Sequence, residues 1–143
     1  MKQNNEKTNA LLIHISSFAG YLFPFGSIIA PLVLWQTQKD KSRFLDEQGK
    51  EAVNFNVSFA LYTLILGAVF FTTSMGTIFN LLDNFGQIDF GYRFSNVNFF
   101  SFFGIASAAG VLGLIKVALI IIAALKSQKG EDYRYPFTIK FIK

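Results

Sequence analysis

The sequence predicts an all-α integral membrane protein, a helical bundle with two long transmembrane helices plus a broken N-terminal hydrophobic hairpin or kinked helix. Hydrophobic residues make up 52% of the chain and charged residues 15%, whereas a soluble domain carries about 25% charge. The charges cluster and leave three uncharged tracts, at residues 8–38, 52–82 and 94–115. About 20 apolar helical residues cross the hydrocarbon of a bilayer, so each tract is long enough. We expect one membrane domain over residues 1–143.

The first tract, residues 8–38, is predicted to be broken. As one straight helix it would extend about 46 Å, which exceeds the roughly 30 Å of hydrocarbon. Pro24 stands in its middle and Pro31 follows, and proline removes a helical hydrogen bond and clashes with the preceding turn. The tract is therefore either one kinked helix or two short helices, residues 10–22 and 27–38.

The two later tracts predict the long helices. The second tract indicates a helix over residues 52–76, entered through a charged stretch in which Ser42 or Asp40 is the expected N-cap. We expect this helix to fray at residues 72–76. The third indicates a helix over residues 99–125, after which Gly130 suits the left-handed capping position.

The distribution of cations predicts the topology. The loop at residues 39–51 and the tail at residues 126–143 are basic, whereas the loop at residues 83–98 contains Arg93 as its one cation. The positive-inside rule therefore places the first loop and the C-terminal tail in the cytoplasm. A hairpin keeps Lys2 and Lys7 on that side as well. Charge therefore favours the hairpin over a single crossing, although only these two lysines decide it.

Two segments outside the helices are aromatic. The outer loop, residues 83–98, is expected to rest on the outer leaflet, with a binding site as the alternative; its aromatic residues are Phe85, Phe90, Tyr92 and Phe94. In the tail, residues 133–143 alternate apolar with polar side chains. This pattern favours an extended segment on the inner interface, with its cations near anionic lipid. The alternative is a peptide that docks a partner.

Lys116 is the one charge within the third predicted helix. A lysine at this depth costs on the order of 2.5–3.5 kcal/mol on insertion scales. Its helical face carries small residues, which let membrane helices approach closely, so Lys116 should point into the bundle. These residues are Ala106, Ala109, Gly113, Ala123 and Ala124.

The second predicted helix carries a polar stripe that includes Asn54, Ser58 and Tyr62. Tyr62 lies at the depth of Lys116 and is its expected partner, by its hydroxyl or its ring face. Lys116 is either a substrate or proton site, or a buried lysine that reaches the inner interface.

The remaining chemistry-bearing residues give little support to catalysis. His14 is the only histidine and the chain has no cysteine, so these residue types cannot form a metal cluster. We expect His14 to join two helices by hydrogen bonds rather than to relay protons. The acidic residues of the loop at residues 39–51 stand among cations, which favours a self-paired surface over a cation site. No phosphate-binding, nucleophile-elbow or kinase motif is present. We therefore expect no catalytic residue, no metal, no cofactor and no nucleic-acid partner.

Several short motifs occur in a characteristic order along the chain. They are His14, Pro24-Phe25-Gly26, Leu34-Trp35, Gly49-Lys50-Glu51-Ala52 and Tyr133-Arg134-Tyr135-Pro136-Phe137. In this order the chain resembles the Tic-twenty-like family of small bacterial membrane proteins of unknown function. The resemblance implies a compact helical bundle, distantly related to the channel-forming subunit of the chloroplast inner-envelope protein translocon. It supplies no catalytic residues.

Together these observations predict a small, non-enzymatic protein of the bacterial inner membrane. We expect it to pack with itself, as a homo-oligomer, or within a larger membrane complex, where it aids the passage of polypeptides or solutes. The alternative is a small transporter or channel subunit in which Lys116, Tyr62 and Asn54 line the path.

Overall fold

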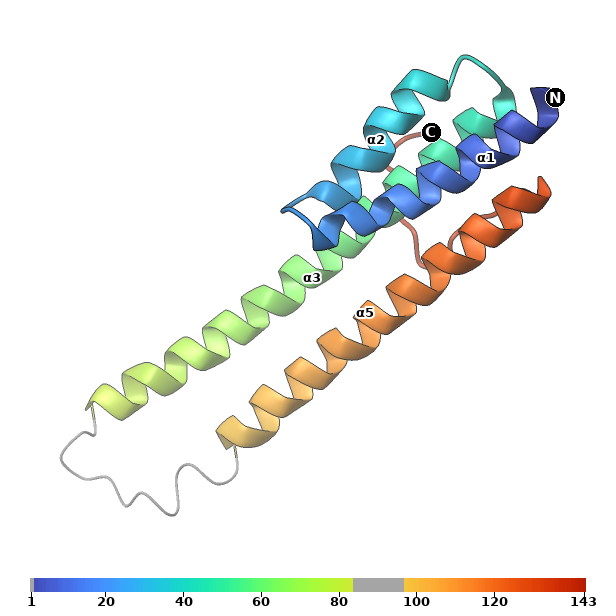
Figure 1. The fold of residues 1–143 in the computed structure, drawn as a ribbon. Coiled ribbons are helices and arrows are strands. Elements are labelled where there is room, and N and C mark those ends of the chain that lie inside the picture. The colour runs from blue at the N-terminus through green and yellow to red at the C-terminus, as the bar shows by residue number, and fades with distance from the viewer. Residues whose placement is uncertain (1, 84–96) are drawn as a thin grey trace. The chain divides into compact units, whose positions relative to one another are not determined.

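The computed structural model describes residues 2–83 and 97–143, and all regular structure in these ranges is helical (Figure 1). The two longest helices, α3 and α5, are apolar enough to cross a membrane. The predicted all-α class, with two long membrane helices and a broken N-terminal segment, is confirmed. In chain order the elements are α1 (Lys2–Ile15), the 3₁₀ helix η1 (Ser16–Tyr21), α2 (Gly26–Gln38), α3 (Arg43–Asp83) and α5 (Val97–Lys129).

The chain divides into two compact units. The first unit, Met1–Ala60 with Ile115–Lys143, contains the N-terminal helices, the beginning of α3, the end of α5 and the C-terminal tail. The second unit, Leu61–Leu114, contains the remaining parts of α3 and α5. The expected outer-leaflet segment at residues 83–98, with its four aromatic residues, lies almost wholly outside the described residues.

The N-terminal segment is a hairpin in which α1 and η1 pack against α2 (Figure 1). Its corner lies at Pro24-Phe25-Gly26, as predicted, where Phe25 adopts a left-handed φ of 62° immediately before α2. The predicted first helix, residues 10–22, has the wrong bounds, because α1 begins at Lys2 and gives way to η1 at Ser16. There the Ser16 hydroxyl donates to the Ile13 carbonyl at 2.6 Å. Such local bonds compete with regular α-helix.

Helix α3 is longer than the predicted residues 52–76. It begins at Arg43, where the amide of Leu45 donates to the predicted Ser42 cap at 3.3 Å. The expected fraying at residues 72–76 is wrong, because α3 continues to Asp83. The Thr72 and Thr73 hydroxyls both donate to carbonyl oxygens of the preceding turn. Their polar groups are therefore satisfied within the helix.

Helix α5 also exceeds the predicted residues 99–125, and its predicted capping glycine is confirmed. Gly130 has a φ of 84°. The Gly130 amide donates to Ser127 at 3.0 Å and the Glu131 amide donates to Lys126 at 3.1 Å, both to carbonyl oxygens. This pair of bonds is a Schellman motif, which satisfies carbonyls that a helix end leaves open. The tail leaves α5 in a defined direction as a result.

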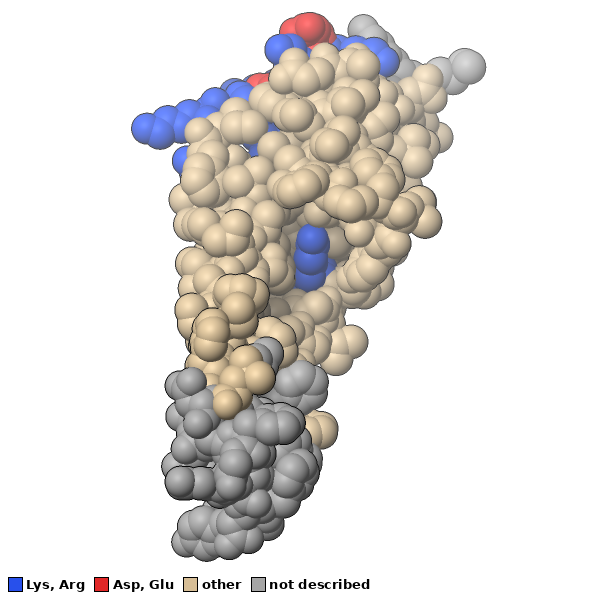
Figure 2. All heavy atoms as spheres, turned by 90° about the vertical axis from the view of Figure 1, so that its left-hand side faces the viewer, with Lys and Arg blue, Asp and Glu red and all other residues tan. Residues whose placement is uncertain are grey.

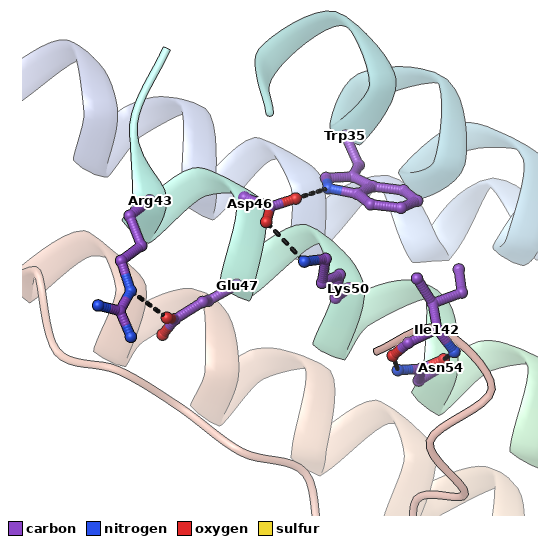
Figure 3. Close-up of polar contacts among 7 residues, drawn as sticks. All are labelled: Trp35, Arg43, Asp46, Glu47, Lys50, Asn54 and Ile142. Atoms are coloured by element: carbon purple, nitrogen blue, oxygen red, sulfur yellow. Dashed lines mark hydrogen bonds and ion pairs between the residues drawn. The ribbon is translucent and has the colours of Figure 1, made fainter. Parts of the chain in front are cut away.

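Helices α2 and α3 approach each other closely at Gly49. A Cβ atom at this position would collide with the Trp35 side chain. Trp35 is itself held in place, because its indole nitrogen donates to Asp46 at 2.9 Å (Figure 3). The apolar core of the first unit is formed by Ala10, Ile13, Leu45 and Ala52, with Leu34 and Phe44 packed against it.

We expect Gly49→Ala to destabilise the protein by about 1–3 kcal/mol, because an inserted methyl group displaces a tightly packed side chain. Gly67→Ala in the same helix is the matched control. Nothing lies within 4 Å of a Cβ placed at Gly67, so that change should stabilise the helix by about 0.5–1 kcal/mol. Unfolding in mixed micelles measures both, and equal effects of the two changes would contradict the close approach.

The surface of the described residues suits a bilayer. Large apolar side chains on both long helices are exposed, among them Leu64 (68%), Phe71 (63%) and Leu114 (73%). Figure 2 shows that charged side chains of the first unit gather at one edge of that unit. Because hydrocarbon is the solvent that accommodates such a surface, a lipid bilayer surrounds these helices.

Candidate functional site

A chain of buried polar side chains joins four segments of the first unit. His14 Nδ1 lies 2.9 Å from the Tyr135 hydroxyl, and His14 Nε2 lies 3.0 Å from Gln48 Oε1. Ser127 donates to the same Gln48 oxygen at 3.3 Å. Since a carboxamide oxygen only accepts hydrogen bonds, Nε2 carries the proton and Nδ1 accepts from Tyr135. The four residues tie α1, α3, α5 and the tail together.

Burial keeps the two titratable members of this chain uncharged. Desolvation lowers the pKa of His14 from 6.5 to about 4, although the hydrogen bond to Gln48 opposes the shift. Desolvation also raises the pKa of the Tyr135 hydroxyl well above 10, with smaller contributions from Tyr133 and Glu51. His14 is fully buried. It therefore links helix to tail as a neutral ring, which agrees with the hydrogen-bonded role expected for it.

The C-terminal strap, residues 133–143, is held along α3 by side-chain hydrogen bonds. The Tyr135 amide donates to Glu51 at 3.3 Å and the Ile139 amide donates to Ser58 at 2.9 Å. The Tyr135 ring also stacks on Phe55, with the ring centroids 3.9 Å apart. Main-chain amides and one aromatic side chain thus fix the first part of the strap.

Asn54 holds the end of the strap. Its Oδ1 accepts hydrogen bonds from the amides of Phe141 and Ile142, at 3.1 and 2.9 Å. Its Nδ2 donates to the Ile142 carbonyl at 2.9 Å (Figure 3). Non-helical backbone is tolerated in a membrane where protein groups satisfy it. The polar stripe of α3 therefore gives an irregular segment its hydrogen bonds.

Lys116 lies on the part of α5 that belongs to the first unit. Its ammonium nitrogen is 5.8 Å from the centroid of the Phe59 ring, a cation–π distance, and its side chain is half-buried. Tyr62 belongs to the second unit, and its pairing with Lys116 stays a prediction. The structure thus brings His14, Asn54 and Ser58 to the strap and Lys116 to Phe59.

The charged beginning of α3 is self-paired, as expected for Asp46 and Glu47. Asp46 forms an ion pair with Lys50 and Glu47 forms one with Arg43, each at 2.6 Å (Figure 3). These pairs join residues one helical turn apart. Within residues 2–83 and 97–143, no group of three or more His, Asp or Glu side chains is arranged to hold a metal ion.

The His14 partners Gln48 and Tyr135 were not predicted, nor was Ser127, which donates to Gln48. Gln48 and Ser127 stand in helical segments whose periodicity gives no sign that they are buried. The alternation in the tail does not single out Tyr135, because Phe137, Ile139 and Phe141 of the same alternation are exposed. Tyr135 is the buried aromatic residue of that alternation.

These features define a small helical membrane protein whose buried polar groups fasten its own C-terminal tail. Residues 5–142 match the MamF/MmsF family, described as the magnetosome magnetite crystal formation protein family. Because this match covers nearly the whole chain, the protein belongs to that family. No curated protein and no solved structure matches the chain.

The family match corrects the predicted Tic-twenty-like membership, which is wrong. The motifs behind that prediction determine the fold: Pro24-Phe25-Gly26 forms the hairpin corner, Gly49 admits Trp35, and Tyr135 anchors the strap. Short motifs of this kind specify turns and close contacts, and they do not separate one family of helical membrane proteins from another. The description of the matched family names crystal formation and indicates no catalytic activity.

Proposed function

We propose that this protein is a non-enzymatic, structural component of the magnetosome membrane that takes part in magnetite crystal formation. It acts by packing with itself or within a larger membrane complex. Family membership supports the setting. One observation supports the structural role. Asn54 and Ser58, on the polar stripe of α3, form hydrogen bonds with the main chain of the strap. Because these polar side chains hold the strap on α3, they stabilise the fold.

The proposed topology follows from the charges. The basic loop between α2 and α3 and the C-terminal strap face the cytoplasm, in line with the positive-inside rule. The hairpin of α1 and α2 keeps the N-terminus on the same side. The end of α3 at Asp83 and the beginning of α5 at Val97 then lie on the opposite side of the magnetosome membrane.

A transporter or channel subunit is the second candidate, and Lys116 is the observation that favours it. This cation lies at the middle of the candidate span Phe103–Lys129, where an ionisable residue is costly and marks a substrate or ion pathway. In this case Lys116 faces the path, with Tyr62 as its predicted neighbour.

Crystal size in a magnetite-forming bacterium tests both candidates. Deletion of the gene should shift the distribution of crystal lengths measured by electron microscopy, and the unaltered gene should restore it. On the structural proposal, Lys116→Leu restores crystals as well as the unaltered chain does, because leucine preserves packing in the span. On the transporter alternative, Lys116→Leu fails to restore them although the protein reaches the membrane. Crystals unchanged by the deletion would refute both.

A further inference from the structure

The outer side of the strap is apolar and cationic. Phe137 is 81% exposed, Phe141 52% and Ile139 42%. Three cations of the same segment are exposed as well, namely Arg134, Lys140 and Lys143. No acidic side chain follows Asp132. The strap therefore presents aromatic and aliphatic groups together with an unbalanced positive charge.

The backbone holds one of these aromatic side chains in a strained position. Phe137 has a φ of 58°, a left-handed conformation that is unfavourable for an L-residue. The bonds of the Tyr135 amide to Glu51 and of the Ile139 amide to Ser58 fix the chain on either side. Backbone strain persists only where the surroundings impose it. Here the imposed conformation exposes a large apolar side chain.

The position of the strap along α3 corresponds to the edge of the hydrocarbon. The charged first turns of α3 end at Glu51, where the uncharged tract of residues 52–82 begins. Ser58, which binds the Ile139 amide, lies about 10 Å further along the helix axis. Further along the strap, the Ile142 amide donates to Asn54, which lies one helical turn before Ser58. This depth matches the 5–10 Å or so to which amphipathic segments enter a membrane interface.

We propose that the C-terminal strap is a binding surface for anionic lipid. The Phe137, Ile139 and Phe141 side chains enter the acyl region, and Arg134, Lys140 and Lys143 contact negatively charged headgroups. Charge complementarity selects this occupant, because each cation near an anionic leaflet contributes about 1 kcal/mol of attraction. Apolar side chains beside the cations suit a lipid surface better than a soluble anion. The bonds to α3 hold the segment in the bound conformation, so little conformational entropy is lost on binding.

Paramagnetic relaxation in nanodiscs tests this proposal with the full chain. The discs contain phosphatidylcholine and phosphatidylglycerol in equal amounts, and a nitroxide is carried by the headgroup of either lipid or by an acyl chain. We expect the phosphatidylglycerol headgroup label to relax the Lys140 and Lys143 amide signals more than the phosphatidylcholine label does. The acyl-chain label should relax the Phe137 signal more than that of Lys41, a residue of the loop before α3. Equal relaxation by both headgroup labels, or equal acyl-chain effects at Phe137 and Lys41, would overturn the proposal.

Two substitutions that each remove one positive charge provide a test variant and its control. Lys140→Gln should reduce the phosphatidylglycerol enrichment by about fivefold, whereas Lys41→Gln removes one positive charge outside the strap and should leave it unchanged. Unchanged chemical shifts of the Ile142 amide, which binds Asn54, establish that the strap stays docked in each variant. Added salt should lower the enrichment, since ions screen exposed charges. An enrichment indifferent to both Lys140→Gln and salt would also count against the proposal.

Discussion

Replacing Asn54 by leucine should release the end of the strap and destabilise the protein by about 2–4 kcal/mol, because buried groups that lose a hydrogen-bond partner cost about 1–3 kcal/mol each. Asn54 is buried and makes three hydrogen bonds to the main chain of Phe141 and Ile142. Leucine has nearly the same shape, so the change removes the bonds and preserves packing. Hydrogen exchange at the two amides measures release, and unfolding in mixed micelles measures the free energy.

Asn56 provides the control for this experiment. It is also fully buried in α3, but its side-chain amide donates to Ser17 at 2.7 Å and to the Ala52 carbonyl at 2.9 Å. Asn56→Leu should therefore weaken the contact with η1 and leave exchange at Phe141 and Ile142 slow. If both variants accelerate that exchange equally, Asn54 has no special part in holding the strap.

Acidification should weaken the protein through His14. Its pKa is about 4 in the folded protein, below the ordinary value of 6.5, so the unfolded chain takes up the proton first. The contribution of His14 to the free energy of unfolding should be constant above pH 6.5 or so and fall by up to about 1.4 kcal/mol per pH unit as the pH drops toward 4. Below the folded pKa the contribution of His14 is fully lost. Unfolding at a series of pH values measures the slope.

The histidine contribution is isolated by comparison with His14→Gln, which does not titrate. His14 is the only histidine in the chain, so carboxylates alone govern the remaining pH dependence of the variant near pH 4–5. The slopes of the two curves should differ only between the pKa values of about 4 and 6.5. Parallel curves through this window would mean that His14 is accessible to protons in the folded state.

Features that depend on residues adjacent in the sequence were predicted correctly. The corner at Pro24-Phe25-Gly26 follows from the backbone chemistry of proline and glycine. The cap at Gly130 follows from the cost that other residues incur with a positive φ. The helix bounds were less accurate; at Ser16, for example, a hydroxyl bond to the Ile13 carbonyl accompanies the change from α1 to η1. Such bonds are not visible in hydrophobic periodicity.

The sequence by itself determined that this protein is helical, that two of its helices are long enough to span a bilayer, and where its N-terminal segment breaks. Composition and local backbone preferences contain that information. Only the tertiary structure decided what the polar residues of α3 do. Asn54 and its partner Ile142 are 88 positions apart, and no local pattern specifies a contact over that distance. A buried amide binds whichever main-chain group the packing of the helices brings to it, and here that group belongs to the strap.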